Sequence, residues 1–303
     1  MRISSLSQPQ RMLATLETGN TQIQKLQDQL STQQKQTLPS EDPLNATRTS
    51  ALTQQQAVTA QYQTNITTLN DTLTRQDTLL SSMSDQLLSL QDQLRSMNNA
   101  TQSASSYASY QTQLSSLSEG IVGLLNSQDA EGRYIFGGTQ SDKPPVVMVD
   151  GQYQWQGNKG ERAVQVGQQQ SVNGNSDLST LFAVGDDPLG FLNQLGQLQK
   201  QLSASGSTTL PDSSALSTLL QQSSDVSTRL GSARGSIGSR QNQLTQLSNV
   251  YTDLTAANSE VLSQLQSTDI ADTTLQLQSW LKTVEYSSKA YSLMNQFSMF
   301  DAI

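Results

Sequence analysis

Apolar side chains recur every three or four residues along much of this chain. In the segment 66–97, nine of ten positions with that spacing are apolar. A heptad stripe of this length predicts a long helix that packs against other helices. The ten positions are Ile66, Leu69, Leu73, Gln76, Leu80, Met83, Leu87, Leu90, Leu94 and Met97.

The stripe changes phase near 101–106 and then continues. Two arrangements remain open: one helix from about 44 to 130 with a stutter, or two helices with a break between them. The later positions of the stripe are Tyr107, Tyr110, Leu114, Leu117, Ile121 and Leu124.

A second stripe occupies 226–265, and we interpret the two stripes as walls of one bundle. Arg240 and Asn258 interrupt it, and lone polar residues at such positions commonly fix helix register. The outer faces carry Gln, Ser and Thr, so copies of the chain could stack through hydrogen bonds; a solvated neutral face is the alternative. The remaining positions are Val226, Leu230, Ala233, Ile237, Leu244, Leu247, Tyr251, Leu254, Val261 and Leu265.

Both chain ends carry weaker helical stripes. With little core of their own, these helices are expected to be poorly ordered until they pair with each other or with neighbouring copies. This pattern favours assembly over a free-standing enzyme. The candidate interface residues are Leu13, Leu16, Ile23, Leu26, Leu281, Val284, Tyr291, Met294 and Phe297.

Between the stripes, the segment 141–182 has the signature of a small β-rich insertion. Asp150-Gly151 lies between two short runs of β-forming residues, which predicts a hairpin with a tight turn. A helix is expected again at about 188–202, followed by a loop at 206–212.

The composition excludes most catalytic chemistry. The 303 residues contain neither histidine nor cysteine, which rules out a Ser-His-Asp triad, a cysteine nucleophile, the usual zinc sites and disulfides. We therefore expect no catalytic residue, no cofactor and no metal ligand. The net charge of −8 argues against nucleic acid as a partner.

Hydrophobic residues make up only 34% of the chain, while Gln and Ser, 44 of each, fill much of the rest. A disordered Gln/Ser tract is the alternative, but only 7 prolines and the strong periodicity favour a thin helical protein. The sequence has no run long enough for a membrane span and no apolar core of a secretory signal. We expect a protein that is cytosolic or exported by another route.

An enzyme could still be built from carboxylates alone. The candidates Asp150, Glu161, Asp186 and Asp187 lie in or near the β insertion, in contexts more typical of turns and helix caps. Trp155 could stack on a sugar, but hairpin aromatics more often pack against the core. An enzyme is thus not expected.

Two short motifs lie at the expected ends of helices. The first motif is Pro39-Ser40-Glu41-Asp42-Pro43. In it, Asp42 can cap a helix whose first residue is Pro43. The second, Gly132-Arg133-Tyr134-Ile135-Phe136-Gly137-Gly138, follows the first stripe. It predicts a short strand, with its two aromatic side chains on one face, and a glycine turn. Each motif alone is an ordinary helix start or stop.

Together and in this order, the motifs resemble the flagellin superfamily, more closely its hook–filament junction branch. The start at Met1 to Ser4 is similar to the Met-Arg-Ile-Ser start of that branch, and Pro39 to Pro43 is similar to its Pro-Ser-Asp-Asp-Pro element, with Glu41 in place of the first Asp. Gly132 to Gly138 is similar to its Gly-Arg-Tyr-Ile-Phe element. The ending Ser298-Met299-Phe300 is a looser match.

The resemblance implies a mainly α fold: an elongated antiparallel helical bundle, or coiled coil, built from both chain ends, with a small β-rich insertion domain. Residues 1–40 would form an N-terminal core helix that pairs with a C-terminal core helix at 269–303. Residues 41–140 would be the long-helix half of the bundle, 141–182 the outer β-rich domain and 183–268 the returning helices.

It also implies a structural adaptor of the bacterial flagellum that templates filament assembly. The expected partners are a ring of its own copies, the hook-side junction protein (hook-associated protein type 1), flagellin, and a cytosolic export chaperone at the C-terminal helix. The protein would be extracellular after type III export and cytoplasmic before it. The alternatives are flagellin itself, as the filament subunit, and a type III-exported adhesin that binds through 141–182.

Overall fold

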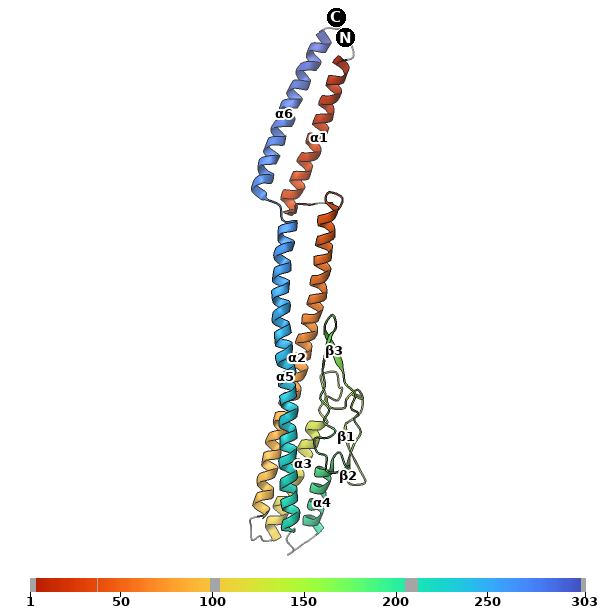
Figure 1. Ribbon diagram of the computed structural model, residues 1–303, viewed down its shortest axis with the longest axis vertical. Coiled ribbons are helices and arrows are strands. Elements are labelled where there is room, and N and C mark those ends of the chain that lie inside the picture. Colours follow the sequence, from red (N-terminus) through yellow and green to blue (C-terminus); the bar gives the residue numbers. More distant parts are fainter. Residues whose placement is uncertain (1–3, 37, 99–103, 205–211, 301–303) are drawn as a thin grey trace. The chain divides into compact units, whose positions relative to one another are not determined.

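The computed structural model describes residues 4–36, 38–98, 104–204 and 212–300, with side chains described over 10–36, 38–98, 108–203 and 212–294 (Figure 1). The chain divides into two compact units. We call residues 1–59 with 252–303 the terminal unit, and residues 60–251 the central unit. The helices are α1 (Ser4–Thr32), α2 (Pro43–Asn98), α3 (Ala104–Leu125), α4 (Gly190–Ala204), α5 (Ser213–Gln266) and α6 (Ile270–Phe300).

The fold is mainly α, as the periodicity predicts. The strands are β1 (Val146–Val149), β2 (Gln152–Trp155), β3 (Ala163–Gly167) and β4 (Gln170–Asn173). They form two separate antiparallel hairpins, β1–β2 and β3–β4. Asp150 (φ 50°) and Gly151 (φ 74°) both adopt the left-handed conformation that the predicted two-residue turn requires.

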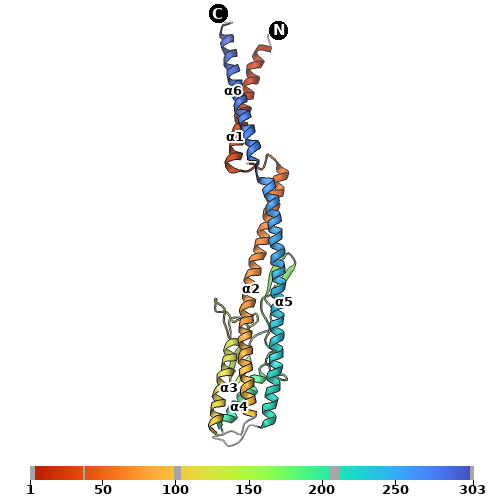
Figure 2. The same ribbon diagram turned by 90° about the vertical axis from the view of Figure 1, so that its left-hand side faces the viewer.

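The first stripe forms one wall of the core of the central unit. All ten positions are buried, and its polar member Gln76 donates a hydrogen bond from Nε2 to the carbonyl of Gly174 at 2.7 Å. The segments of α2 and α5 in this unit are tied together by the ion pair of Arg234 with Asp77, at 2.8 Å. In Figures 1 and 2, α3 and α4 lie beside these segments.

The open choice between one helix and two is settled in favour of two, because α2 ends at Asn98 and a separate helix begins at Ala104. The returning helix predicted at 188–202 is α4. The predicted loop at 206–212 lies outside the described residues except for its last residue. That residue, Asp212, caps α5 by accepting a hydrogen bond from the N–H of Ser214 at 3.1 Å.

The second stripe needs one correction near its end. Val261 was expected in the seam but is 42% exposed, whereas the adjacent Leu262 is 9% exposed. Both residues are apolar, so the pattern alone did not distinguish them. The preceding buried position is Asn258, and a step of four rather than three residues then brings Leu262 to the same face.

The polar interruption Arg240 lies on α5 and ties that helix to the segment after β4. Its guanidinium donates to the carbonyls of Asn173 and Asn175, at 2.8 and 2.9 Å, and to the hydroxyl of Ser176 at 2.8 Å. Burial lowers the pKa of Arg240. This residue thus fixes how the β insertion seats on α5.

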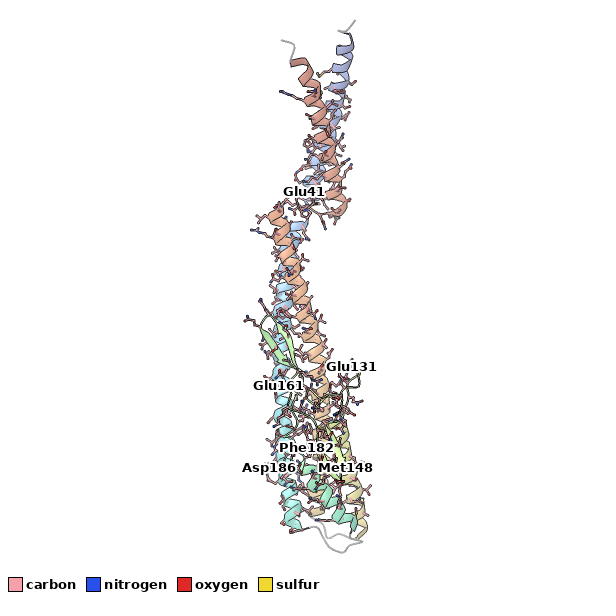
Figure 3. The ribbon with its side chains drawn as sticks, turned by 90° about the vertical axis from the view of Figure 1, so that its right-hand side faces the viewer. Glu41, Glu131, Met148, Glu161, Phe182 and Asp186 are labelled. Atoms are coloured by element: carbon pink, nitrogen blue, oxygen red, sulfur yellow. The ribbon has the colours of Figure 1, made fainter. Side chains whose placement is uncertain are left out.

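The β hairpins complete the helical core. Val146, Val166 and Val172 are buried in the same hydrophobic cluster as the helices. Phe182, in the segment before α4, is also buried and stacks on Phe191 with ring centroids 6.3 Å apart (Figure 3).

The prediction of a short strand at 132–138 is wrong. Tyr134 forms only an isolated bridge with Gln128, and the chain then turns. Ile135 and Phe136, which are consecutive, are both buried, at 5% and 1% exposure. A regular strand would alternate them between two faces. The glycines that flank this segment let it turn inward, with φ of 77° at Gly132 and 72° at Gly138.

Candidate assembly surfaces

Helices α1 and α6 of the terminal unit pack side by side (Figures 1 and 2). Gly19 lies close against α6: a Cβ atom at this position would sit 2.5 Å from Val284 Cγ2 and 3.7 Å from the Trp280 ring. Glycine inside a helix weakens it by about 1 kcal/mol relative to alanine. The close contact supplies the reason for a glycine here.

The nine predicted interface residues differ in how far this pairing covers them. Leu26 is 5% exposed, whereas Leu13 and Leu281 remain 48% exposed. The side chain of Phe297 lies outside the described residues. The α1–α6 pair thus buries only part of the predicted apolar surface. The partly buried members are Leu16, Ile23, Val284, Tyr291 and Met294.

The far side of α6 carries three exposed apolar residues that are not among the predicted interface residues, with Ser279 and Lys282 between the first two on the same face. Leu275 and Tyr286 are each 65% exposed and Leu293 is 55% exposed. At 100° per residue these three lie within about 20° of one another, and opposite the face that meets α1. We call them the outer stripe. Its signal in the sequence was the spacing of 11 and 7 residues between apolar positions.

The first motif builds the start of α2. The Asp42 carboxylate accepts the N–H of Asn45 at 3.0 Å, and Pro43 is the first helical residue, as predicted. Glu41 forms an ion pair with Lys25 of α1 at 3.2 Å (Figure 3). Asn45 in turn donates from Nδ2 to the carbonyl of Leu265 at 3.0 Å. The motif therefore holds parts of α1, α2 and α5 together in the terminal unit.

The two connections between helices in this unit are also joined to each other. The N–H of Lys35 donates to the Gln266 carbonyl at 2.6 Å, and the N–H of Thr268 donates to the Gln33 carbonyl at 3.1 Å. Gln33 adopts a left-handed conformation, with φ of 57°. The segments 33–36 and 266–268 thus form a short antiparallel crossing.

The second motif is organised around Asp129. Its Oδ1 accepts the N–H groups of Glu131 and Arg133, at 3.1 and 2.8 Å, and its Oδ2 accepts Nε of Arg133 at 2.9 Å. Burial of Asp129 raises the pKa of its carboxyl, but these hydrogen bonds and the Arg133 charge outweigh burial, so the pKa is lowered. The carboxylate pins the turn that leads into the buried Ile135 and Phe136.

The end of the same motif fits closely against another loop. A Cβ at Gly138 would overlap the carbonyl oxygen of Asn158. The N–H of Asn158 donates to the Gly137 carbonyl at 3.3 Å, and its Oδ1 accepts the N–H of Thr139 at 2.8 Å. Gly138 therefore allows a close backbone contact with Asn158.

A groove of about 460 Å³ lies between this turn and α2. Arg75, Arg133 and Arg162 line it together with Asp71 and Asp129. Burial and the neighbouring charge of Arg133 lower the pKa of Arg162. Opposite charges are mixed along its walls, so it is not a patch of one sign.

The acidic residues considered for catalysis do not converge. Asp150 lies in the hairpin turn, and Asp187 accepts the N–H of Leu189 at 2.9 Å just before α4. Glu161 and Asp186 lie at separate places on the surface (Figure 3). Within the described residues, no three acidic side chains gather as a metal site. Trp155 packs against the core cluster.

Among the described helices, none contains a stretch long and apolar enough to cross a lipid bilayer. The remaining exposed apolar side chains are spread over several elements. They include Met148 and Val149 on β1, Leu88 and Val58 on α2, and Val250 on α5.

Comparison with known proteins gives consistent similarities. The family model of the bacterial flagellin N-terminal helical region matches residues 3–141. Flagellar hook-associated protein 3 of Salmonella typhimurium is 28% identical over 164 residues, which cover 54% of this chain and 50% of that protein. This match spans half the length of the Salmonella protein. Flagellar hook-associated protein 3 of Escherichia coli is 23% identical over 314 residues, covering 99% of each chain.

A solved structure is similar as well. The structure of a flagellar hook-associated protein from Vibrio parahaemolyticus is 25% identical, with a TM-score of 0.70. The alignment covers 75% of this chain and all of that one.

Proposed function

We propose that this chain belongs to the flagellin superfamily, among the proteins related to flagellar hook-associated protein 3, and that it joins the hook to the filament. It is a structural protein of the flagellum rather than an enzyme. Both curated relatives carry the name of the hook-associated protein, which favours the junction over the filament subunit.

The observation that carries the proposal is the apolar surface left on the paired α1 and α6. The outer stripe of Leu275, Tyr286 and Leu293 is more than half exposed, and it lies opposite α1. Burying such side chains stabilises an assembly by about 25 cal/mol for each Å² removed from water. We infer that neighbouring subunits cover this surface when the junction forms.

The proposed partners follow from this role. Copies of the chain would form a ring through α1 and α6, with the hook-side junction protein on one side and flagellin on the other. Before export, a cytosolic chaperone would cover the apolar surface of α6. The assembled protein would lie outside the cell.

We further propose that assembly is coupled to ordering of the chain ends. In a dilute subunit, α1 and α6 would exchange between paired and open states, and neighbours would fix the paired state. NMR relaxation of the dilute subunit tests this, and rigid terminal helices there would refute it.

The function is tested by electron microscopy of cells that lack the gene. We expect hooks without filaments and flagellin released into the medium, with restoration by the wild-type gene. Loss of the filament without released subunits would indicate a filament subunit instead. Intact filaments would refute both structural roles and favour an adhesin.

A further inference from the structure

The β1–β2 sheet has only two strands and therefore two edges. In an antiparallel pair, every second residue turns its N–H and C=O away from the partner strand. The bond from the N–H of Gln156 to the carbonyl of Pro145, at 2.8 Å, fixes the phase. In that phase Val146 on β1 and Tyr153 on β2 face outward, one on each edge.

An asparagine side chain occupies each of these edges. The N–H of Val146 donates to Asn126 Oδ1 at 3.0 Å, and Asn126 Nδ2 donates to the Val146 carbonyl at 2.8 Å. The N–H of Tyr153 donates to Asn193 Oδ1 at 2.7 Å, and Asn193 Nδ2 donates to the Tyr153 carbonyl at 3.0 Å. Each amide supplies the same donor and acceptor that a further strand would supply.

The two asparagines are held from the helices. Asn126 directly follows α3, and Asn193 lies in the first turn of α4. Nδ2 of Asn193 also donates to the Asp187 carboxylate at 2.9 Å, which fixes the orientation of its amide. Each asparagine amide forms two hydrogen bonds with its edge residue, so it satisfies both the N–H and the carbonyl of that residue.

We propose that Asn126 and Asn193 are edge-blocking residues, which keep the β1–β2 sheet from pairing with a strand of a second copy of this chain. Unpaired strand edges are templates for such pairing, and natural proteins block them. Pairing between copies would be possible here without the block, because β1 continues past Val146 to Met148, which is 60% exposed. Any two copies present the same edge, so a second copy is the matching partner.

This inference rests on the contacts of the central unit and not on the junction role. The test uses the full chain with Asn126→Ala and Asn193→Ala combined. The matched control combines Ser116→Ala and Gln197→Ala, two exposed polar residues on α3 and α4. Sedimentation velocity over a range of concentrations measures self-association, and circular dichroism checks that the helices remain.

We expect the double asparagine variant to self-associate about tenfold more strongly than the wild type, and the control to match the wild type. A third variant adds Met148→Pro to the double asparagine variant. Met148 turns its N–H outward, so this proline removes a donor for pairing between copies and leaves the β1–β2 bonds in place. It should return association to the wild-type level.

Two results would overturn the proposal. If the double asparagine variant is folded and associates no more than the control, the asparagines only brace the hairpin against the helices. If it associates, Met148→Pro on β1 does not reverse this and the Tyr153 amide on the β2 edge gains no protection as concentration rises, the contact between copies lies elsewhere. If the double variant loses its helices, each single variant is measured by hydrogen exchange instead. In Asn193→Ala, the Tyr153 amide must exchange faster than in the wild type when the sample is dilute. It must regain protection as the concentration rises. Protection that stays independent of concentration would contradict the proposal.

Discussion

At the scale of single residues, Gly19 makes the sharpest prediction. Gly19→Ala should loosen the α1–α6 pair, because the new methyl would meet the stiff, β-branched Val284 at 2.5 Å. Gly235→Ala on α5 is the control: its Cβ meets nothing within 4 Å, so it should stabilise its helix by up to about 1 kcal/mol. Urea unfolding followed by circular dichroism measures both substitutions, and Trp280 fluorescence in a Trp155→Phe background follows the terminal unit separately. Equal stabilisation by both substitutions would contradict the close contact.

Asp129 makes a prediction about pH. Its pKa is lowered in the folded protein from an ordinary value of 3.8, so its charged form stabilises the fold above that value. This contribution is lost as the pH falls through the lowered pKa. Asp129→Asn should therefore cost about 1 kcal/mol at pH 7 and less at a pH well below 3.8. Denaturation at both pH values, with the exposed Asp142→Asn as control, checks this, and an equal loss at both would contradict it.

Sequence analysis predicted some residue roles and missed others for physical reasons. The cap by Asp42 and the turn at Asp150-Gly151 depend on residues close in the sequence, so both were predicted. The contact of Gly19 with Val284 and the bonds of Asn193 join distant segments. Nothing in the local pattern marks them, although a glycine inside a helix is a hint of close packing.

At the scale of elements, the stripe in α2 predicts a strong effect of proline. Leu90→Pro should break the helix and cost about 3 kcal/mol or more, beyond the loss of the buried side chain. Leu90→Ala separates the two effects, because it removes the side chain and keeps the helix. Circular dichroism and denaturation measure both. A fully helical, stable proline variant would show that residue 90 does not lie inside the helix.

The elements themselves were largely predictable. Heptad spacing identified the cores of α2 and α5, because burial on one face imposes that period. The period does not distinguish two adjacent apolar residues, which explains the error at Val261 and Leu262. The prediction of a strand at 132–138 was wrong for a different reason. The glycines of this segment permit a turn that buries Ile135 and Phe136 together, whereas the residue pattern is typical of a strand.

At the scale of the whole molecule, the two units should respond differently to truncation. Deleting about 35 residues from either end removes α1 or α6 and should abolish assembly. The central unit should stay folded, because the first stripe and the buried positions of the second from Val226 to Leu244 lie within residues 60–251. Denaturation of the truncated proteins and their failure to restore filaments measure the two effects. Loss of the central unit's cooperative unfolding would contradict this division.

The most direct test of the central claim concerns the outer stripe. Cells lacking the gene are supplied with the variant that combines Leu275→Ser, Tyr286→Ser and Leu293→Ser. The control combines Val58→Ser and Val250→Ser, which removes exposed apolar side chains elsewhere. Export is measured from the protein in the medium, and filaments by electron microscopy. We predict that both variants are exported but only the control restores filaments; normal filaments with the stripe variant would contradict the account.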